Sequence, residues 1–213
     1  MSYYKIKNLE EYFKHYKKSV REPRKFWEKV ASENFTWYQE WDKVVDFNMA
    51  EAEIKWFTNA KVNIVKNCID RHLAKKGDKT AIIFEPNDPT EQALHITYNE
   101  LHERVCKMAN VLKEQGIEKG DRVCIYLPMI PELAISILAC ARIGAIHSVI
   151  FAGFSASAVN SRINDSQCKM VITSDGGYRG NKTIDLKSIV DEALLNSPSV
   201  KNVLVVKRIN TDI

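Results

Sequence analysis

The sequence predicts an α/β fold with a mainly parallel sheet flanked by helices, preceded by a helical, aromatic-rich N-terminal arm. From residue 62 onward, segments with helical spacing of apolar residues alternate with short apolar runs of strand character. Before that point aromatic residues are dense, and all four tryptophans lie within residues 27–56. We therefore expect two parts, an arm at residues 1–58 and a main body at residues 59–213.

Two helices are expected in the arm. Asn8 and Glu11 have the spacing of a capping box, and apolar residues recur at helical spacing from residue 9 to residue 16. Pro23 suits the first turn of a second short helix that runs to Val30. Because aromatic side chains dominate burial in cores and interfaces, we expect the arm to pack on the main body rather than to hold a cofactor.

Caps, prolines and glycines set the expected bounds of elements in the main body. Thr97 and Glu100 form a capping box, and Gly116 closes the helix that follows. Pro131 opens the next helix, and Gly144 ends it. The expected helices are 62–73, 97–116, 131–142, 155–164 and 186–195, and the expected strands are 80–84, 94–96, 122–127, 145–151, 169–173 and 202–206.

Strand–helix–strand repetition with short connections predicts parallel pairing. In such sheets, ligands bind at the carboxyl ends of the strands. Two glycine-containing loops, residues 151–154 and 175–182, follow predicted strands directly. We therefore expect both loops at the same edge of the sheet, where a binding site is expected.

The second of these loops has the composition of an anion site. Arg179 and Lys182 stand three residues apart, with Gly180 and Asn181 between them. Glycine lets backbone N–H groups approach an anion closely, and the two cations add charge-assisted donors. The loop is therefore a candidate phosphate-binding loop. The alternative is an exposed strand–helix connection, in which glycine and basic residues are also common.

Other nucleotide and catalytic motifs fit badly. No G-x-G-x-x-G follows a predicted strand, so a dinucleotide site is not indicated. Residues 176–183 match the P-loop pattern except that Asn181 replaces the second glycine, and only one strand follows, which argues against a P-loop. The five histidines have no triad or metal spacing, and no G-x-S-x-G elbow occurs. The residues alone thus predict an anion-binding domain with no catalytic residue and no metal site.

The charge distribution and the cysteines indicate which binding partners and which cellular compartment to expect. Of 31 Lys/Arg and 27 Asp/Glu, residues 1–30 hold nine and four, so the remainder is nearly balanced and a nucleic-acid partner is not expected. The five widely spaced cysteines are typical of buried thiols in a reducing compartment. No apolar signal core and no run near ~20 apolar residues occurs. We expect a cytoplasmic protein without a membrane contact, and its oligomeric state stays open.

Five segments resemble AMP-forming acetyl-CoA synthetases, a family within the adenylate-forming acyl/aryl-CoA ligases. The resemblance covers essentially the whole chain, including the aromatic arm, which other ligases of that superfamily mostly lack. The segments that carry it are Trp-Tyr-Gln-Glu-Trp-Asp at 37–42, Leu-Pro-Met-Ile-Pro-Glu at 127–132, residues 142–154, Ser-Arg-Ile-Asn-Asp at 161–165, and Arg-Gly-Asn-Lys at 179–182.

The resemblance implies a two-step ligation. Acetate attacks the α-phosphate of ATP, bound with Mg²⁺, to give an acetyl-adenylate and pyrophosphate, and the thiol of coenzyme A then displaces AMP. Residues matching Arg179 and Lys182 contact the 3′-phosphate and diphosphate region of coenzyme A in this family. Residues matching Phe151, Ala152 and Gly153 line its nucleotide. Asn181 departs from the family, which often has glycine there.

The resemblance also implies that much of the enzyme is missing. The family's Thr/Ser/Gly-rich ATP loop, its ribose-binding aspartate, its acyl-pocket tryptophan and its C-terminal lysine lie downstream of the matched region. The chain thus resembles an N-terminal portion with no catalytic residue of its own, and we expect it to be inactive alone. A propionate-activating relative, a non-catalytic module that binds coenzyme A or a nucleotide, and loops that bind nothing are the alternatives.

Overall fold

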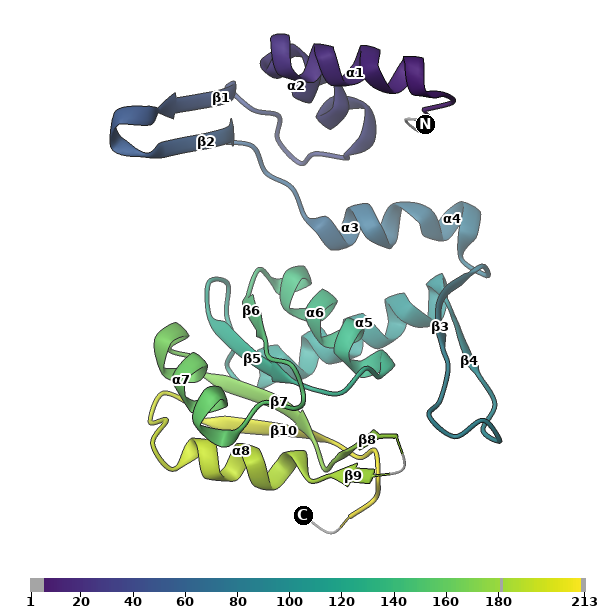
Figure 1. The fold of residues 1–213 in the computed structure, drawn as a ribbon, viewed down its shortest axis with the longest axis vertical. Helices are drawn as coiled ribbons and strands as arrows, with labels where there is room; N and C mark the ends of the chain where they lie inside the picture. Colours follow the sequence, from purple (N-terminus) through teal and green to yellow (C-terminus); the bar gives the residue numbers. More distant parts are fainter. Residues whose placement is uncertain (1–5, 181, 212–213) are drawn as a thin grey trace. The chain divides into compact units, whose positions relative to one another are not determined.

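The structure is a computed structural model that describes residues 6–180 and 182–211 (Figure 1). The chain divides into two compact units, Met1–Asn67 and Cys68–Ile213. None of the described helices is long and apolar enough to cross a membrane.

The first unit contains two helices and a hairpin. Asn8 caps α1 (Leu9–Arg21) by accepting a hydrogen bond from the backbone N–H of Glu11 at 2.8 Å, and α2 (Pro23–Asn34) begins at the proline, as predicted. The antiparallel strands β1 (Lys43–Asn48) and β2 (Glu53–Thr58) follow, joined by the 3₁₀ turn η1 (Met49–Glu51). The hairpin was not predicted, although apolar and polar residues alternate over 45–48 and 53–56; most of its side chains are exposed in the structure.

Aromatic rings pack beside this hairpin. Trp37 and Trp41 contact each other with ring centroids 5.1 Å apart, and both contact Phe57 at 5.5 and 4.9 Å. The buried side chain of Asn67 accepts from the backbone N–H of Thr36 at 2.7 Å and donates to its carbonyl at 3.0 Å. These contacts hold the segment between α2 and β1, so its aromatic residues serve packing.

A helix predicted over residues 62–73 is broken in the structure. The helical turns are α3 (Ile64–Cys68), η2 (Asp70–His72) and α4 (Leu73–Lys76). Ile69, which is buried, leaves the helical conformation with φ −120° and ψ −69° and separates the first two. Burial of this side chain therefore coincides with an interruption that the apolar spacing did not reveal.

The second unit is built on a parallel sheet of four strands in the order β10-β7-β5-β6. All four strands were predicted. Their bounds are β5 (Arg122–Tyr126), β6 (Ile146–Val149), β7 (Met170–Ser174) and β10 (Asn202–Val206). The α/β class with a mainly parallel sheet is therefore confirmed.

Helices cover both faces of this sheet (Figure 1). Thr97 and Glu100 form the predicted capping box, Pro131 and Gly144 bound the next helix, and Ser155 caps the third. The helices α5 (Tyr98–Glu114) and α6 (Pro131–Ile143) pack together on one face of the sheet. The helices α7 (Ala156–Ser166) and α8 (Leu186–Leu194) pack together on the opposite face.

Two small hairpins accompany the sheet. The first pairs β3 (Thr80–Phe84) with β4 (Leu94–Thr97), both predicted, and runs antiparallel. The second pairs β8 (Gly177–Arg179) with β9 (Lys182–Ile184), also antiparallel, within the segment predicted as a loop. The β8–β9 pairing was not predicted, because three-residue strands carry no periodic signal of their own.

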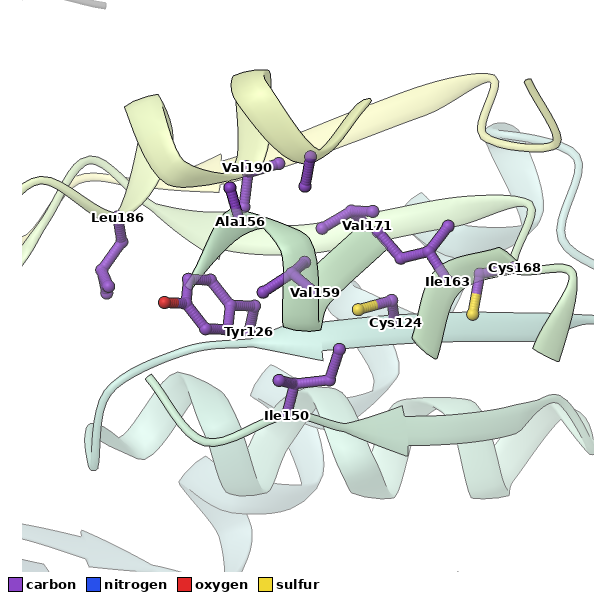
Figure 2. Close-up of a cluster of buried hydrophobic side chains, with 11 residues drawn as sticks. Cys124, Tyr126, Ile150, Ala156, Val159, Ile163, Cys168, Val171, Leu186 and Val190 are labelled. Carbon is purple, nitrogen blue, oxygen red and sulfur yellow. The ribbon is translucent and has the colours of Figure 1, made fainter. Parts of the chain in front are cut away.

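The core between the sheet and the pair α7 and α8 fixes the strand faces. Figure 2 shows Cys124 and Tyr126 of β5 on the side of the sheet that faces Val159 and Ile163 of α7. Val123 and Ile125, which alternate with them, are also fully buried, as both faces of a central parallel strand require. The strand is therefore a nearly continuous apolar run.

The buried thiols make the core directly testable. Burial raises the pKa of Cys124 and of Cys140 to about 12, whereas the side chain of Cys68 is exposed. Because the thiolate is the reactive form, a maleimide at pH 7.5 should label Cys68 quickly, and Cys124 and Cys140 only after denaturation. Peptide mass spectrometry over time measures this order. Equally fast labelling of Cys124 in the folded chain would contradict the described core.

Candidate functional site

The segments that leave all four parallel strands line one cavity of about 590 Å³ at the carboxyl edge of the sheet. This volume is in the range of small-molecule sites. Its walls are mainly apolar, with two arginines and one glutamate among the lining residues. The lining includes Leu127–Ile130 after β5, Val149–Ala152 at and after β6, Tyr178, Arg179 and Ile184 of the β8–β9 hairpin, Arg208 after β10, and Phe84, Glu85 and Asn87 at the end of β3.

Tyr126 ties the end of β5 to the loop after β6. Its buried hydroxyl donates to the carbonyl of Phe154 at 2.8 Å, and its own carbonyl accepts from the Thr173 hydroxyl at 3.0 Å. Burial raises the pKa of Tyr126, which keeps the hydroxyl protonated as a donor. The loop therefore has a fixed end, while Phe151 in it is 67% exposed.

The β8–β9 hairpin brings the two predicted cations together. Arg179 pairs directly with Lys182 across the antiparallel strands, so both side chains leave the same face. Gly180 occupies the turn with φ +60°, a left-handed conformation that glycine adopts without strain. Asn181 lies outside the described residues. Like charges directly opposite each other repel, so an anion bound between them would relieve this repulsion.

The same hairpin rules out a P-loop at residues 176–183. A P-loop runs from a strand directly into a helix that begins at the lysine. Here Lys182 and Thr183 lie on β9, and α8 begins only at Leu186. The near match to the motif is therefore a coincidence of composition.

Asp175 is a polar residue of this edge that the sequence did not single out. Its side chain is fully buried and accepts hydrogen bonds from the backbone N–H groups of Gly176 at 2.8 Å, Arg208 at 2.7 Å and Ile209 at 3.1 Å. Burial alone would raise the pKa of Asp175, but these backbone donors outweigh it and hold the pKa below its usual range. The sequence signal that could have identified this residue is its position, since Asp175 directly follows a buried strand.

Arg208 was also missed. It lies two residues beyond β10 and lines the cavity beside the β8–β9 hairpin. Its guanidinium carbon is 5.2 Å from the ring centre of Tyr178 and 5.7 Å from that of Phe84. No motif marks this residue, since its position depends on contacts with chain segments 30 and 124 residues earlier.

Only some of the predicted site residues line a cavity in the structure. Phe151, Ala152 and Arg179 line the large cavity, and Gly180 borders a neighbouring cavity of about 350 Å³. Gly153 and Lys182 are not among the residues that line either cavity, although Lys182 is placed by its pairing with Arg179. Within residues 6–180 and 182–211, no group of three His, Cys, Asp or Glu side chains is arranged to hold a metal ion.

Replacing Asp175 by Asn should destabilise the second unit by about 1–3 kcal/mol at pH 7, because the backbone donors lose an ionised acceptor. A carboxyl whose folded pKa lies below its ordinary value of 3.8 contributes stability above that pH and loses it as the pH falls further. The difference from the natural chain should therefore shrink below about pH 4. Urea unfolding at several pH values measures it.

The exposed Asp165, changed to Asn, is the matched control for the loss of one carboxylate, and it should alter stability little at any pH. A loss for Asp175→Asn that is the same at pH 7 and pH 3.5 would contradict an ionised carboxylate at this position.

Comparison with known proteins adds family information. Residues 12–68 match the family model described as acetyl-coenzyme A synthetase N-terminus, and residues 69–212 match the one described as AMP-binding enzyme. Acetyl-coenzyme A synthetase of Alkalilimnicola ehrlichii is 52% identical over 198 residues, which are 93% of this chain and 30% of that protein. Acetyl-coenzyme A synthetase of Saccharophagus degradans is 50% identical, with 97% and 32% covered.

A solved structure is similar in fold. Acetoacetyl-CoA synthetase from Streptomyces lividans matches with a TM-score of 0.85 and 26% identity, covering 92% of this chain and 30% of that one. The chain thus spans about a third of the length of these relatives.

Proposed function

This chain belongs to the AMP-binding enzyme family, and on that premise we propose that it is the N-terminal portion of an AMP-forming acetyl-CoA synthetase. The match to the family's N-terminal model and relatives near 50% identity that carry that name support the assignment. We interpret residues 1–58 as the arm and residues 59–213 as the first part of the AMP-binding domain.

The proposed reaction of the whole protein joins acetate to coenzyme A. ATP, with Mg²⁺, activates acetate as an acetyl-adenylate with release of pyrophosphate, and the thiol of coenzyme A then displaces AMP. The chain's own part in this reaction is to bind the nucleotide end of coenzyme A. Adenylate chemistry is assigned to the remaining two thirds of the enzyme. The names of the relatives favour acetate over propionate and favour an enzyme over a non-catalytic module.

One observation supports the coenzyme A site most directly: the β8–β9 hairpin pairs Lys182 with Arg179, and Arg179 lines a mainly apolar cavity. Apolar walls that include Phe151 and Ala152 suit an adenine ring. The cationic pair suits the phosphates, which bind arginine through two parallel hydrogen bonds. Gly153 and Gly180 complete the proposed site as backbone of the two loops, and the proposal also includes Asn181, which lies outside the described residues.

We further propose a cytoplasmic location and small-molecule partners only. All five cysteines are free, and Cys124, Cys140 and Cys168 are buried, as in proteins of reducing compartments. The excess positive charge is confined to the N-terminal segment, which supports the absence of a nucleic-acid partner.

Changing both Arg179 and Lys182 to Ala should weaken coenzyme A binding about tenfold, because both side chains are exposed and each contact is worth about 0.5–1 kcal/mol. The affinity for dephospho-coenzyme A, which lacks the 3′-phosphate, should fall less than the affinity for coenzyme A. Isothermal titration of the purified chain with both ligands measures the two losses.

The matched control removes two other exposed cations, Lys113 and Lys201, which precede β5 and β10 at the opposite edge of the sheet. It changes net charge equally and should leave both affinities unchanged. Equal losses for the two ligands in the hairpin variant would remove the 3′-phosphate assignment, and no loss at all would refute the site.

The chain by itself should not form an adenylate, because the ATP loop and the catalytic lysine of the family are expected downstream. Exchange of radiolabelled pyrophosphate into ATP by the purified 213-residue chain should equal the rate without protein. Exchange above that control, with acetate present, would place adenylate chemistry inside this chain.

A further inference from the structure

Arg208 is a second arginine of the cavity and is not on the β8–β9 hairpin. It follows β10, and it lines the cavity together with Arg179. The only carboxylate among the lining residues is that of Glu85, and no ion pair joins it to Arg208. The cavity wall formed by described residues therefore carries a net positive charge.

The Arg208 side chain is held by two aromatic rings. Its guanidinium lies over Tyr178 of β8 and over Phe84 at the end of β3, at 5.2 and 5.7 Å from the ring centres. Both distances are within the range of cation–π attraction. Within the described residues, its guanidinium makes no hydrogen bond or ion pair, so its N–H groups have no partner of this kind. Stacking thus orients the group without consuming its donors.

The backbone of Arg208 is held independently by Asp175. The buried carboxylate accepts from the N–H of Arg208 at 2.7 Å and from that of Ile209, while the N–H of Asp175 donates to the Val206 carbonyl at 3.0 Å. Ile209 also packs closely on Gly176, where a Cβ would collide with its side chain. The segment after β10 is therefore fixed to the exit of β7.

A pre-positioned guanidinium whose donors make no hydrogen bond within residues 6–180 and 182–211, at a cationic cavity, is suited to a phosphate group. Arginine binds phosphate through paired N–H donors, and holding the side chain in advance reduces the entropy lost on binding. The stacking on Tyr178 places Arg208 next to the strand that carries Arg179. Two arginines from different chain segments, Arg179 and Arg208, therefore line the same cavity.

We propose that Arg208, stacked on Tyr178 and Phe84 and positioned by Asp175, binds a phosphate of the adenine-nucleotide part of coenzyme A in the cavity that it lines together with Arg179. This inference rests on the proposed function, in which the cavity accepts coenzyme A. It adds a binding residue outside the hairpin and a positioning residue behind it.

Titration of the purified chain with coenzyme A and with dephospho-coenzyme A tests the proposal. Arg208→Ala should weaken coenzyme A binding about fivefold to tenfold, a reduced effect for a partly exposed contact. The fold is preserved in this variant because Asp175 bonds the backbone N–H, not the side chain. Lys207→Ala removes the neighbouring exposed charge, which does not line the cavity, and should bind as the natural chain does.

Comparing the losses of affinity for the two ligands shows which phosphate of coenzyme A contacts Arg208. A loss for both assigns Arg208 to the diphosphate, and a loss confined to coenzyme A assigns it to the 3′-phosphate. Equal affinity of Arg208→Ala, Lys207→Ala and the natural chain would overturn the proposal. That result, obtained while the Arg179 and Lys182 double variant still weakens binding, would leave the proposed function standing. Failure of the natural chain to bind coenzyme A would instead refute the proposed function itself.

The positioning role of Asp175 has a separate readout. Asp175→Asn should weaken coenzyme A binding in the natural chain but cause no further loss when Arg208 is already Ala. An equal loss in both backgrounds would overturn the role of Asp175. Phe84→Leu, which removes one ring and leaves the carboxylate, should give a smaller loss that also vanishes in the Arg208→Ala background, so the coupling is tested even if Asp175→Asn does not fold.

Discussion

In the second unit, β10, β7, β5 and β6 pair in one direction, so the segment after each strand emerges at the same edge of the sheet. Those four segments line one cavity. A single antiparallel strand in the sheet would send its following segment to the other edge. The parallel order requires β5 to be buried on both faces, and its apolar run of Val123 to Tyr126 meets that requirement. The cavity is thus a consequence of strand direction rather than of any one loop.

Two buried polar groups then convert this arrangement into a shaped site. The Tyr126 hydroxyl holds the loop after β6, and the Asp175 carboxylate holds the segment after β10 to the exit of β7. Both act on backbone groups, so they fix where the loops run without restricting which side chains those loops carry. Phe151, Arg179 and Arg208 are consequently free to face a ligand while their backbones are held.

The sequence predicted features that depend on local signals. β3 and β10 begin and end at the predicted residues, and the capping box at Thr97 starts α5 as expected, because caps and short apolar runs act within a few residues. The β1–β2 hairpin was missed although apolar and polar residues alternate over 45–48 and 53–56, and its side chains are mostly exposed in the structure. Asp175 and Arg208 were missed because their roles depend on contacts 33 residues apart, which no local pattern contains. The resemblance to acetyl-CoA synthetases supplied the coenzyme A assignment that the residue pattern alone could not.

Family membership, strand direction and paired cations all support the binding of coenzyme A at this edge of the sheet. The most direct measurement is a crystal structure of the chain with coenzyme A bound. We expect the adenine ring in the cavity beside Phe151, with phosphate oxygens within hydrogen-bonding distance of Arg179. Coenzyme A bound elsewhere on the chain, with the cavity empty at a saturating concentration, would contradict it.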